Sequence, residues 1–254
     1  MFWTWAFIEL NEANFNERTQ SQRFQNISQF SLLGVGDEKL TSFYSELLSH
    51  KSLFGFLDIC QRNVSGLSTD ILCQLLTRIN WIFLKKVTLS EDQMTQIVSR
   101  LAGSDQLELD SLYFVETDLS TVSPESLSRL AVRLTRLELY DAGLMSEQTV
   151  ALFSMFLSSS ECKLEYLELS YNDLSAVPPD LLSSAVLKIK EVKISNCQLT
   201  RIQLSAMFSS IAECPDLKLS VLEVFGNNLS AVSPAIISSG NSSNTFPPEI
   251  VFIS

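Results

Sequence analysis

The sequence predicts an α/β protein, a right-handed solenoid of horseshoe shape, with a parallel sheet on its concave face and helices on its convex face. Three observations lead to this prediction. A frame of apolar residues recurs at seven places between Phe54 and Leu219, and helix-forming segments separate its copies. The copies start alternately 25 and 30 residues apart, so the full unit is a pair of copies, one short and one long. One such unit cannot bury its apolar face alone, whereas stacked units share a continuous core.

The strands are predicted from the frame itself, LxxLxLxx(N/C/T/A)xL. Its copies are FGFLDICQRNV from Phe54, INWIFLKKVTL from Ile79, LDSLYFVETDL from Leu109, LTRLELYDAGL from Leu134, LEYLELSYNDL from Leu164, IKEVKISNCQL from Ile189 and LSVLEVFGNNL from Leu219. The apolar frame positions are expected to face the core. Because side chains alternate along a strand, the third, fifth and seventh positions are expected to point out of the sheet.

A helix is predicted after each strand. Pro124, Pro179 and Pro234 recur once in each pair of copies, and each follows a serine or a proline, which is typical of a helix start. The shorter copies are therefore expected to carry a short helix or turn. The longer copies carry fuller amphipathic segments, which are SEDQMTQIVSRLAG, SEQTVALFSMFLSS and TRIQLSAMFSSIAE. Strands joined through helices pair in parallel.

The whole chain, residues 1–254, is predicted to be a single solenoid domain. Seven clear repeats cover residues 54–230, with degenerate repeats or a cap in 1–53 and a partial repeat or cap in 231–254. WAFIELNEANF is expected to contain an early strand, and FQNISQFSLLG allows two registers. Solenoids need polar end caps, and the first residues are apolar. The chain is therefore expected to associate end to end or to be a fragment of a longer protein.

The frame, its alternating lengths and its outer helices resemble the leucine-rich repeat family, in particular its ribonuclease-inhibitor-like branch. That branch also supplies the repeat domains of intracellular immune receptors. The resemblance implies a protein-recognition role. In this family the ninth frame residue is usually Asn or Cys, and its side chain bonds the loop backbone. Here Arg62, Val87 and Ala142 occupy that position, which predicts a less regular N-terminal half.

Aromatic residues are enriched at the outward positions, where they fill seven of 21 places against 9% of the whole chain. Tyr, Trp and Arg are the anchors that interface cores use. A second reading stays open, because aromatic residues also favour strands and pack on each other across a sheet. The predicted partner-binding residues are Phe56, Asp58, Trp81, Phe83, Lys85, Tyr113, Arg136, Glu138, Tyr140, Tyr166, Glu168, Glu191, Lys193, Glu223 and Phe225.

The predicted face changes character along the chain. Its N-terminal part is apolar around Trp81, and its later part is mostly acidic around Glu168. We expect a partner that places an apolar element near Trp81 and a basic element near Glu168.

The charge balance points to a protein partner with a basic surface. Eighteen Lys and Arg against 29 Asp and Glu give a net charge of −11, which repels nucleic acid and anionic membranes. No apolar run approaches the roughly 18 residues of a membrane span, and the N-terminus lacks the basic start of a signal peptide. The five cysteines show no CxxC spacing, so we expect reduced thiols, no zinc site and a cytoplasmic location.

Catalysis is not expected. His50 is the single histidine, and no phosphate-binding loop is present, so neither a metal nor a cofactor is predicted. Glu138 and Glu168 should be neighbours about 5 Å apart across the sheet, but on an open face they would be solvated. Cys60 is expected to be a plain exposed thiol, with Lys85 as its only activating neighbour.

The leading functional prediction is a non-catalytic protein–protein recognition module that binds its partner on the concave sheet. Two alternatives follow from the resemblance. One is an inhibitor of a basic enzyme such as a ribonuclease. The other is the substrate-recognition part of a ubiquitin-ligase or immune-sensor complex. A purely structural scaffold is a further alternative, and it would require that changes on this face leave every interaction intact.

Overall fold

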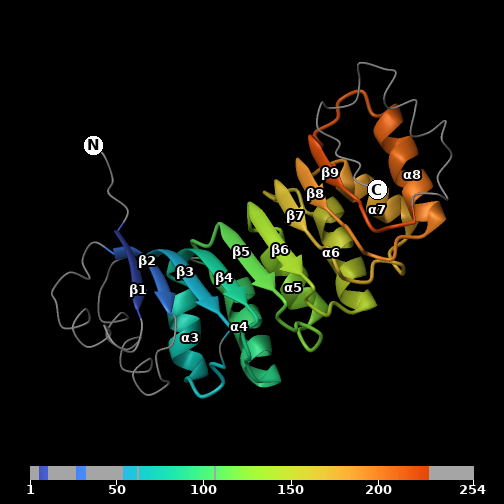
Figure 1. The fold of residues 1–254 in the computed structure, drawn as a ribbon. Coiled ribbons are helices and arrows are strands. Elements are labelled where there is room, and N and C mark those ends of the chain that lie inside the picture. Colours follow the sequence, from blue (N-terminus) through green and yellow to red (C-terminus); the bar gives the residue numbers. More distant parts are fainter. Residues whose placement is uncertain (1–5, 11–26, 33–53, 62, 106, 229–254) are drawn as a thin grey trace, which may run out of the picture. The chain divides into compact units, whose positions relative to one another are not determined.

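The computed structural model describes residues 6–10, 27–32, 54–61, 63–105 and 107–228 (Figure 1). Two compact units, residues 1–117 and 118–254, are described separately. The strands are β1 Ala6–Leu10, β2 Ile27–Leu32, β3 Phe54–Cys60, β4 Ile79–Lys85, β5 Ser111–Val115, β6 Arg136–Tyr140, β7 Tyr166–Glu168, β8 Glu191–Lys193 and β9 Val221–Glu223. The helices are α3 Thr69–Leu76, α4 Glu91–Gly103, α5 Pro124–Ala131, α6 Ser146–Ser158, α7 Pro179–Val186 and α8 Arg201–Glu213.

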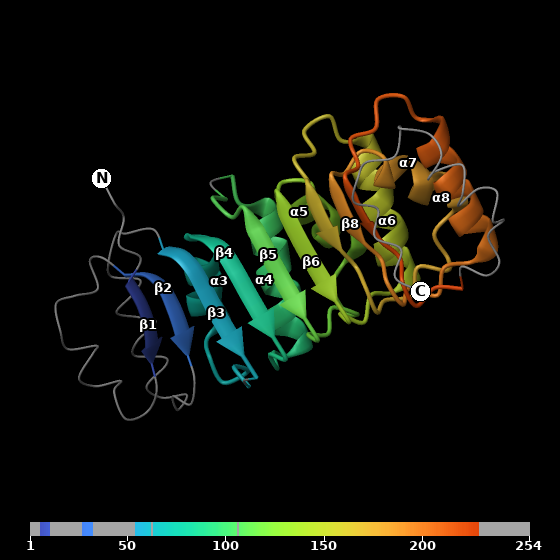
Figure 2. The ribbon, with the colours of Figure 1, turned by 45° about the horizontal axis from the view of Figure 1, so that its top comes forward.

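The first unit contains five parallel strands that lie side by side in chain order, from β1 to β5. The register follows the frame, because Phe56 pairs with Trp81 and Trp81 pairs with Ser111. Helices α3 and α4 lie on one side of this sheet (Figures 1 and 2). Among the described residues of this unit, no helix lies on the other side of β3 to β5.

The ambiguous register before Phe54 is settled by β2. Gln29 pairs with Phe56 and Phe30 pairs with Leu57, so the frame in FQNISQFSLLG begins at Ile27. The predicted early strand is confirmed as β1, in which Ile8 pairs with Phe30. The rest of residues 1–53, including His50, lies outside the described residues.

The second unit repeats the arrangement with β6 to β9, which are parallel and follow chain order. Arg136, Tyr166, Glu191 and Val221 form one register row across these strands. Helices α5 to α8 lie on the same side of this sheet (Figures 1 and 2). The predicted α/β architecture of parallel strands alternating with helices is thus confirmed in each unit.

The two predicted helix lengths are confirmed. Helices α3, α5 and α7 have 8 residues each, and α4, α6 and α8 have 13 each. The start of α5 is capped as the sequence predicts, since the Ser123 hydroxyl accepts from the Ser126 N–H at 3.3 Å and Pro124 follows it. The longer helices α4 and α8 begin with capping boxes, in which Ser90 pairs with Gln93 and Thr200 pairs with Gln203.

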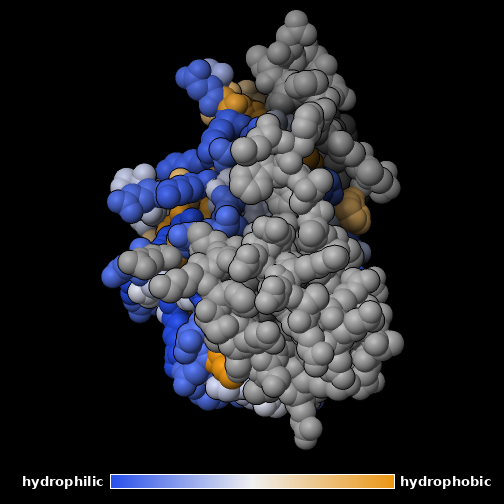
Figure 3. Space-filling model, turned by 90° about the vertical axis from the view of Figure 1, so that its left-hand side faces the viewer, coloured by the Kyte–Doolittle hydropathy of each residue, from blue (hydrophilic) through white to orange (hydrophobic). Residues whose placement is uncertain are grey.

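The core consists of the apolar frame positions and the inner faces of the helices. Leu167, Leu169 and Leu174 are fully buried, as are the large rings of Phe153 and Phe208 from the helices. Packing of this density excludes water and supplies most of the folding free energy. The surface of the described residues in Figure 3 is mainly hydrophilic, with hydrophobic residues in separate small areas.

The eighth frame position turns the chain out of each strand through the left-handed backbone region. Its φ lies between 47° and 70° at Gln61, Lys86, Glu116, Asp141, Tyr171, Asn196 and Gly226. The N–H of this residue donates to the carbonyl of the seventh frame residue in the next copy at Gln61, Lys86, Asp141, Tyr171 and Asn196. Lys86 donates to Val115 at 2.9 Å, and Tyr171 donates to Ser195 at 3.0 Å. The turn therefore continues the pairing of neighbouring copies beyond the strands.

Buried polar side chains that bond the backbone of a neighbouring loop are called clasps here, and a first set of them comes from the ninth frame position. The Asn172 amide is buried, and its oxygen accepts from the backbone N–H groups of Ala142 at 3.1 Å and Leu144 at 3.2 Å. Its nitrogen donates to the carbonyls of Leu139 at 2.6 Å and Leu169 at 2.9 Å. Asn227, at the same position of the next pair of copies, makes the equivalent four bonds, three with the copy that starts at Ile189 and one with the Val224 carbonyl of its own copy.

A second set of clasps comes from glutamines at the third position of the long helices. The Gln148 amide is buried and donates to the carbonyls of Leu119 at 2.7 Å and Val122 at 2.6 Å. Gln203 makes the equivalent bonds to the carbonyls of Leu174 and Val177, and Gln93 donates to the carbonyls of Ser65 and Leu67 in the corresponding loop. Each long helix therefore closes the loop of the preceding short copy.

The glutamine clasps overturn the prediction of irregularity at Val87 and Ala142. Both side chains are buried, at 6% and 0% exposure, and pack as apolar residues. A ninth residue normally bonds the loop of the copy before its own. For Val87 and Ala142 that loop is already bonded by Gln93 or Gln148, so neither position needs a polar side chain. The third residue of that prediction, Arg62, lies outside the described residues.

Two further findings concern the described residues only. No helix among them is both long and apolar enough to cross a membrane. Within the same residues, no group of three or more His, Cys, Asp or Glu side chains is arranged to hold a metal ion.

Candidate functional site

An aromatic strip lies on the helix-free face of the first unit and consists of Phe56, Trp81, Phe83 and Tyr113. The ring centroids are 6.4 Å apart for Phe56 and Trp81, 6.2 Å for Trp81 and Tyr113, and 6.0 Å for Phe83 and Tyr113. All three pairs are tilted, a favourable arrangement of aromatic rings. The structure thus brings together all four predicted apolar residues of this unit.

The register explains why the strip is continuous. Trp81 pairs directly with Ser111, whose short side chain is fully buried and leaves room above it. The indole ring can therefore meet Tyr113 diagonally, two positions along β5. Trp81 remains 42% exposed, whereas the other three rings are half-buried. The rings stabilise the sheet by contact with each other, and Trp81 in addition offers apolar surface to solvent.

The polar residues beside the strip are Asp58, Cys60 and Lys85. The Cys60 thiol is half-buried and donates to the Asp58 carboxylate at 2.9 Å. Burial, followed by this bond and the Asp58 charge, raises the pKa of Cys60 to about 12. The thiol is therefore half-buried where an exposed one was expected, while its raised pKa agrees with the expectation of a plain thiol that Lys85 does not activate.

The Tyr166 cluster, on the helix-free face of the second unit, consists of Arg136, Tyr166, Glu168 and Lys193. The Arg136 guanidinium carbon lies 4.1 Å from the Tyr166 ring centroid, and the Lys193 ammonium lies 5.8 Å from it. Both cations are attracted by the electron-rich ring face. Tyr166 is only 7% exposed, so its ring supports two charged neighbours instead of facing solvent.

Glu168 is buried, which corrects the prediction that this carboxylate would be solvated. It is 7% exposed and accepts from the Ser170 N–H at 3.3 Å and from the Tyr166 hydroxyl at 3.5 Å. Burial raises the pKa of Glu168 above its ordinary value, and the Glu138 charge adds to this effect. The large side chains beside it, which the frame alone does not place, remove it from water.

Acidic groups outnumber basic groups around the cluster, with four glutamates on β6 to β9 against Arg136 and Lys193. The Lys193 ammonium lies 3.0 Å from a Glu223 oxygen and 3.8 Å from a Glu191 oxygen. Burial lowers the pKa of Lys193, but the bond and charge of Glu223 and the other glutamates raise it above its ordinary value overall. The lysine is therefore engaged by its neighbours, and the face keeps a negative balance.

Tyr171 is a candidate contact residue that sequence reasoning missed. Its ring lies 4.9 Å from that of Tyr140, and its side chain is 45% exposed. A bulky residue with φ of 64° is unusual, and Tyr171 is the only aromatic among the eighth frame residues. That single departure from the pattern is the signal that could have identified it, but the frame treats the position as a loop.

The other outward positions differ in exposure. Ser111, Val115, Ser170 and Ser195 are buried, so they are not contact surface. The side chains of Glu138, Tyr140, Glu191, Glu223 and Phe225 are half-buried. Among the described residues, the Ser195 hydroxyl is buried without a hydrogen-bond partner. The side chains of the second unit that a partner could contact are thus the Tyr140–Tyr171 pair and the half-buried Glu138, Glu191 and Glu223. Tyr166 and Glu168 lie beneath them and support them.

The arrangement is suited to recognition by contact and charge. Glu138 and Glu168 are register neighbours, as predicted, but the buried Glu168 carboxylate is shielded from solvent by the side chains around it. Exposed aromatic rings beside acidic groups are the features that bind cationic and apolar side chains of another protein.

Comparison with known proteins supports the repeat assignment. Residues 163–185 match the family described as Leucine Rich Repeat. The match covers the copy that starts at Leu164, its loop and most of α7. The comparison with curated proteins gives no match.

Several solved structures are similar at low sequence identity. A chain of the yeast Rad7 and Elc1 complex is 11% identical with a TM-score of 0.48, and the match covers 98% of this chain and 74% of that one. A chain of the TLR13–ssRNA13 complex is 14% identical with a TM-score of 0.42, covering 80% and 36%. LegL7, a leucine-rich repeat-containing protein from Legionella pneumophila, is 15% identical with a TM-score of 0.41, covering 92% and 88%.

Proposed function

We propose that this leucine-rich repeat protein is a non-catalytic recognition module that binds another protein on the helix-free faces of its two units. Leucine-rich repeat proteins generally mediate protein–protein interaction. The observation that carries the proposal is the gathering of aromatic and charged side chains at the frame positions that the core does not use.

In the first unit, Trp81 is the proposed apolar anchor. Its indole is 42% exposed and is held in place by Phe56 and Tyr113. A large ring that is already fixed loses little conformational entropy when a partner covers it. We propose that the partner places an apolar side chain against this ring.

In the second unit, the Tyr140–Tyr171 pair and the surrounding carboxylates are the proposed site for a basic element. A Lys or Arg side chain of the partner would lie on the exposed ring of Tyr171 and face the Glu138 carboxylate. Burial and charge make Tyr166 and Glu168 supporting residues in this proposal. This assignment revises the expectation from the sequence that Glu168 itself meets the partner.

Affinity purification from cells that contain the protein, followed by quantitative mass spectrometry, tests the proposal. Proteins captured by the wild type should be depleted when Trp81→Ala or Tyr171→Ala is used as bait. Ile202→Ala is the matched control, because Ile202 is an apolar residue of α8 with 70% exposure. Equal capture by all four baits would contradict the proposal and favour a structural scaffold.

Inhibition of a basic enzyme is the second candidate, and the acidic surplus of the second unit favours it. A basic ribonuclease mixed with a large excess of the protein should then lose RNA-cleaving activity. A Glu138→Gln and Glu191→Gln double variant should restore it. Undiminished cleavage in the presence of the wild type removes this candidate and leaves the first intact.

We further propose that the protein acts inside the cell. All five cysteines are free, and each lies on a different element or loop. They are Cys60, Cys73, Cys162, Cys197 and Cys214. Fractionation of the source cells, with detection by antibody, tests this location. Recovery mainly outside the cells would contradict it.

A further inference from the structure

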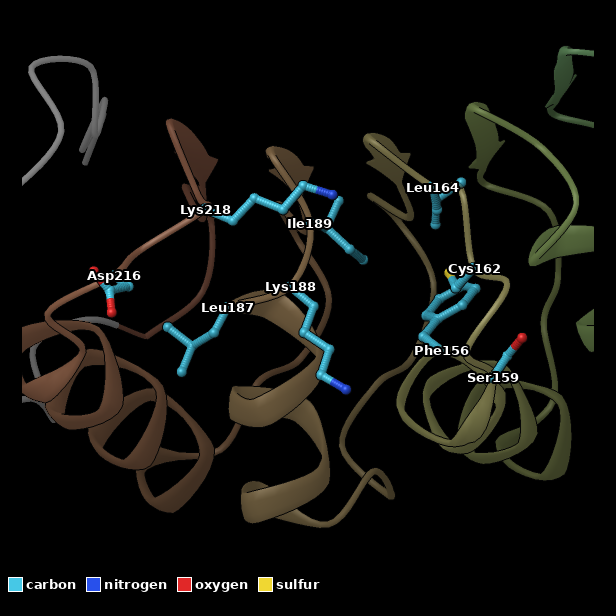
Figure 4. Close-up of a pocket in the computed structure, with 9 residues that line it drawn as sticks. All are labelled: Phe156, Ser159, Cys162, Leu164, Leu187, Lys188, Ile189, Asp216 and Lys218. Carbon is cyan, nitrogen blue, oxygen red and sulfur yellow. The ribbon is translucent and has the colours of Figure 1, made fainter.

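A pocket opens in the second unit at the edge where the strands begin, away from the helix-free face. It has a volume of about 340 Å³ and lies among the C-terminal ends of α6 and α7 and the loop after α8 (Figure 4). Its lining comprises Phe156, Ser159, Cys162, Leu164, Leu187, Lys188, Ile189, Asp216 and Lys218. None of these residues belongs to the site described above.

The inner wall of the pocket is apolar. Phe156, Leu164 and Ile189 are core residues with 1–2% exposure, and the half-buried Leu187 lies beside them. Figure 4 shows Phe156 and Cys162 together on one side of the opening and Leu187 on the other. An apolar side chain that entered here would be removed from water on several sides.

The rim of the pocket is basic, in contrast to the rest of this acidic chain. A cation stands directly before the frame in each copy of the second unit, at Arg133, Lys163, Lys188 and Lys218, and Lys190 follows closely. The four lysines are exposed, and among the described residues none of them is within ion-pair distance of a carboxylate. Lys188 donates to the Leu157 carbonyl at 3.3 Å, which leaves two of its three donors for another acceptor.

The distribution of charge selects the partner. The pocket wall carries one acid, Asp216, against Lys188 and Lys218, and the exposed residues next to it include Lys163 and Lys190 as well as Glu161 and Glu165. Charge complementarity therefore favours an acidic occupant, and the volume suits one large side chain better than the face of a helix.

We propose that this edge pocket binds an acidic segment of a protein partner, which inserts one leucine or aromatic side chain and places its carboxylates on Lys188 and Lys218. The inference goes beyond the proposed function, because it uses a separate surface and a partner segment of opposite charge. Failure of either proposal leaves the other standing, since their variants do not overlap.

The first experiment is selection from a random twelve-residue phage-displayed library on the intact protein. Each round includes prior removal of phage that bind the Lys188→Gln and Lys218→Gln double variant. The enriched peptides should combine several Asp or Glu with a Leu, Phe or Trp. Enrichment of peptides without acidic residues, or none above the depleted background, would overturn the proposal.

The second experiment measures the affinity of the most enriched peptide by fluorescence anisotropy. The Lys188→Gln and Lys218→Gln double variant should bind at least about tenfold more weakly, because two contacting charges are lost. The control is the Arg129→Gln and Arg201→Gln double variant, which changes the net charge equally on exposed helix positions away from the pocket. A Leu187→Asp variant should weaken binding independently, and circular dichroism checks that each variant folds. Equal weakening in the control would assign the binding to overall charge and contradict a pocket.

Discussion

The length of the side chains at the paired positions of the two adjacent strands decides which outward-pointing residues reach solvent. Tyr166 and Trp81 occupy the same third frame position, yet one is 7% exposed and the other 42%. Tyr166 pairs with Arg136 and Glu191, whose long side chains cover it, whereas Trp81 pairs with the short Ser111 on one side. Single positions therefore cannot be assigned to a surface without their partners on both adjacent strands.

The buried Glu168 carboxylate gives a pH dependence. Burial raises its folded-state pKa above the ordinary value of 4.5, so just above that pH the folded chain holds a proton that the unfolded chain has lost. The stability that this group contributes therefore falls as the pH rises from its unfolded-state pKa through its higher folded-state pKa. Glu168→Gln removes the effect, so its unfolding free energy relative to the wild type should increase as the pH rises above 4.5.

Urea denaturation at each pH measures this difference for Glu168→Gln. Glu161→Gln serves as the control, because Glu161 is an exposed loop residue whose side chain forms no ion pair with the described residues. A relative stability of Glu168→Gln that stays constant with pH would show that Glu168 is solvated after all.

Asn172 should be among the polar side chains most important for stability. Asn172→Ala leaves the N–H groups of Ala142 and Leu144 and two carbonyls without their partners in a buried place. We expect a loss of about 2–4 kcal/mol in unfolding free energy. Guanidinium denaturation measures it, with the exposed Asn80→Ala as control. A loss equal to that of the control would show that water replaces the bonds.

At the scale of elements, the two sets of clasps explain why long and short copies alternate. Thr117, Asn172 and Asn227 serve the loops of long copies, and glutamines on the long helices serve the loops of short copies. Each junction therefore has its own chemistry. The repeating unit is therefore a pair of copies for two reasons: the helices alternate in length, and the loops alternate in the kind of side chain that bonds them.

The glutamine clasp can be tested at α6. Gln148→Ala should lower the unfolding free energy by about 1–3 kcal/mol, because two buried loop carbonyls lose their donor. Gln203→Ala, which breaks the equivalent bonds from α8, should have a similar effect. The control is Gln96→Ala, whose amide bonds only an exposed Asp92. Similar midpoints for all three variants in a urea titration would refute the clasp.

The sequence was sufficient for the elements because their causes are local and periodic. Alternation, the serine–proline helix starts and the frame predicted the strands, the helices and the register that pairs Trp81 with Ser111. It was insufficient for Glu168 and Cys60, whose burial depends on the particular side chains beside them, such as Tyr166 beside Glu168 and Asp58 beside Cys60. The glutamine clasps were also missed, although their recurrence once in each pair of copies is visible in the sequence.

At the scale of the whole molecule, the net charge of −11 sets how partners are found. A field of this sign attracts basic proteins at a distance and is weakened by salt. The screening length falls from about 10 Å at 0.1 M salt to about 3 Å at 1 M. Contacts that depend on an apolar anchor are much less sensitive to this change.

Salt should therefore separate two classes of captured partner. Proteins that depend on Tyr171 and the glutamates should elute from the immobilised protein as salt rises from about 0.1 M to about 1 M. Proteins that depend on Trp81 should be retained. Quantitative mass spectrometry of the salt fractions measures this order, and simultaneous elution of both classes would contradict the division of the face.

The clasps also restrict how a chain of this kind can change its length. Asn172 completes a loop that lies about one copy upstream, and Gln148 completes the loop of the copy before its own. Removing one copy would join two loops of the same type and leave buried amides without their counterparts. Removing or duplicating a complete pair of copies would restore every bond. Insertions and deletions between relatives should therefore come in whole pairs, so that the pair is the smallest heritable building block of this architecture.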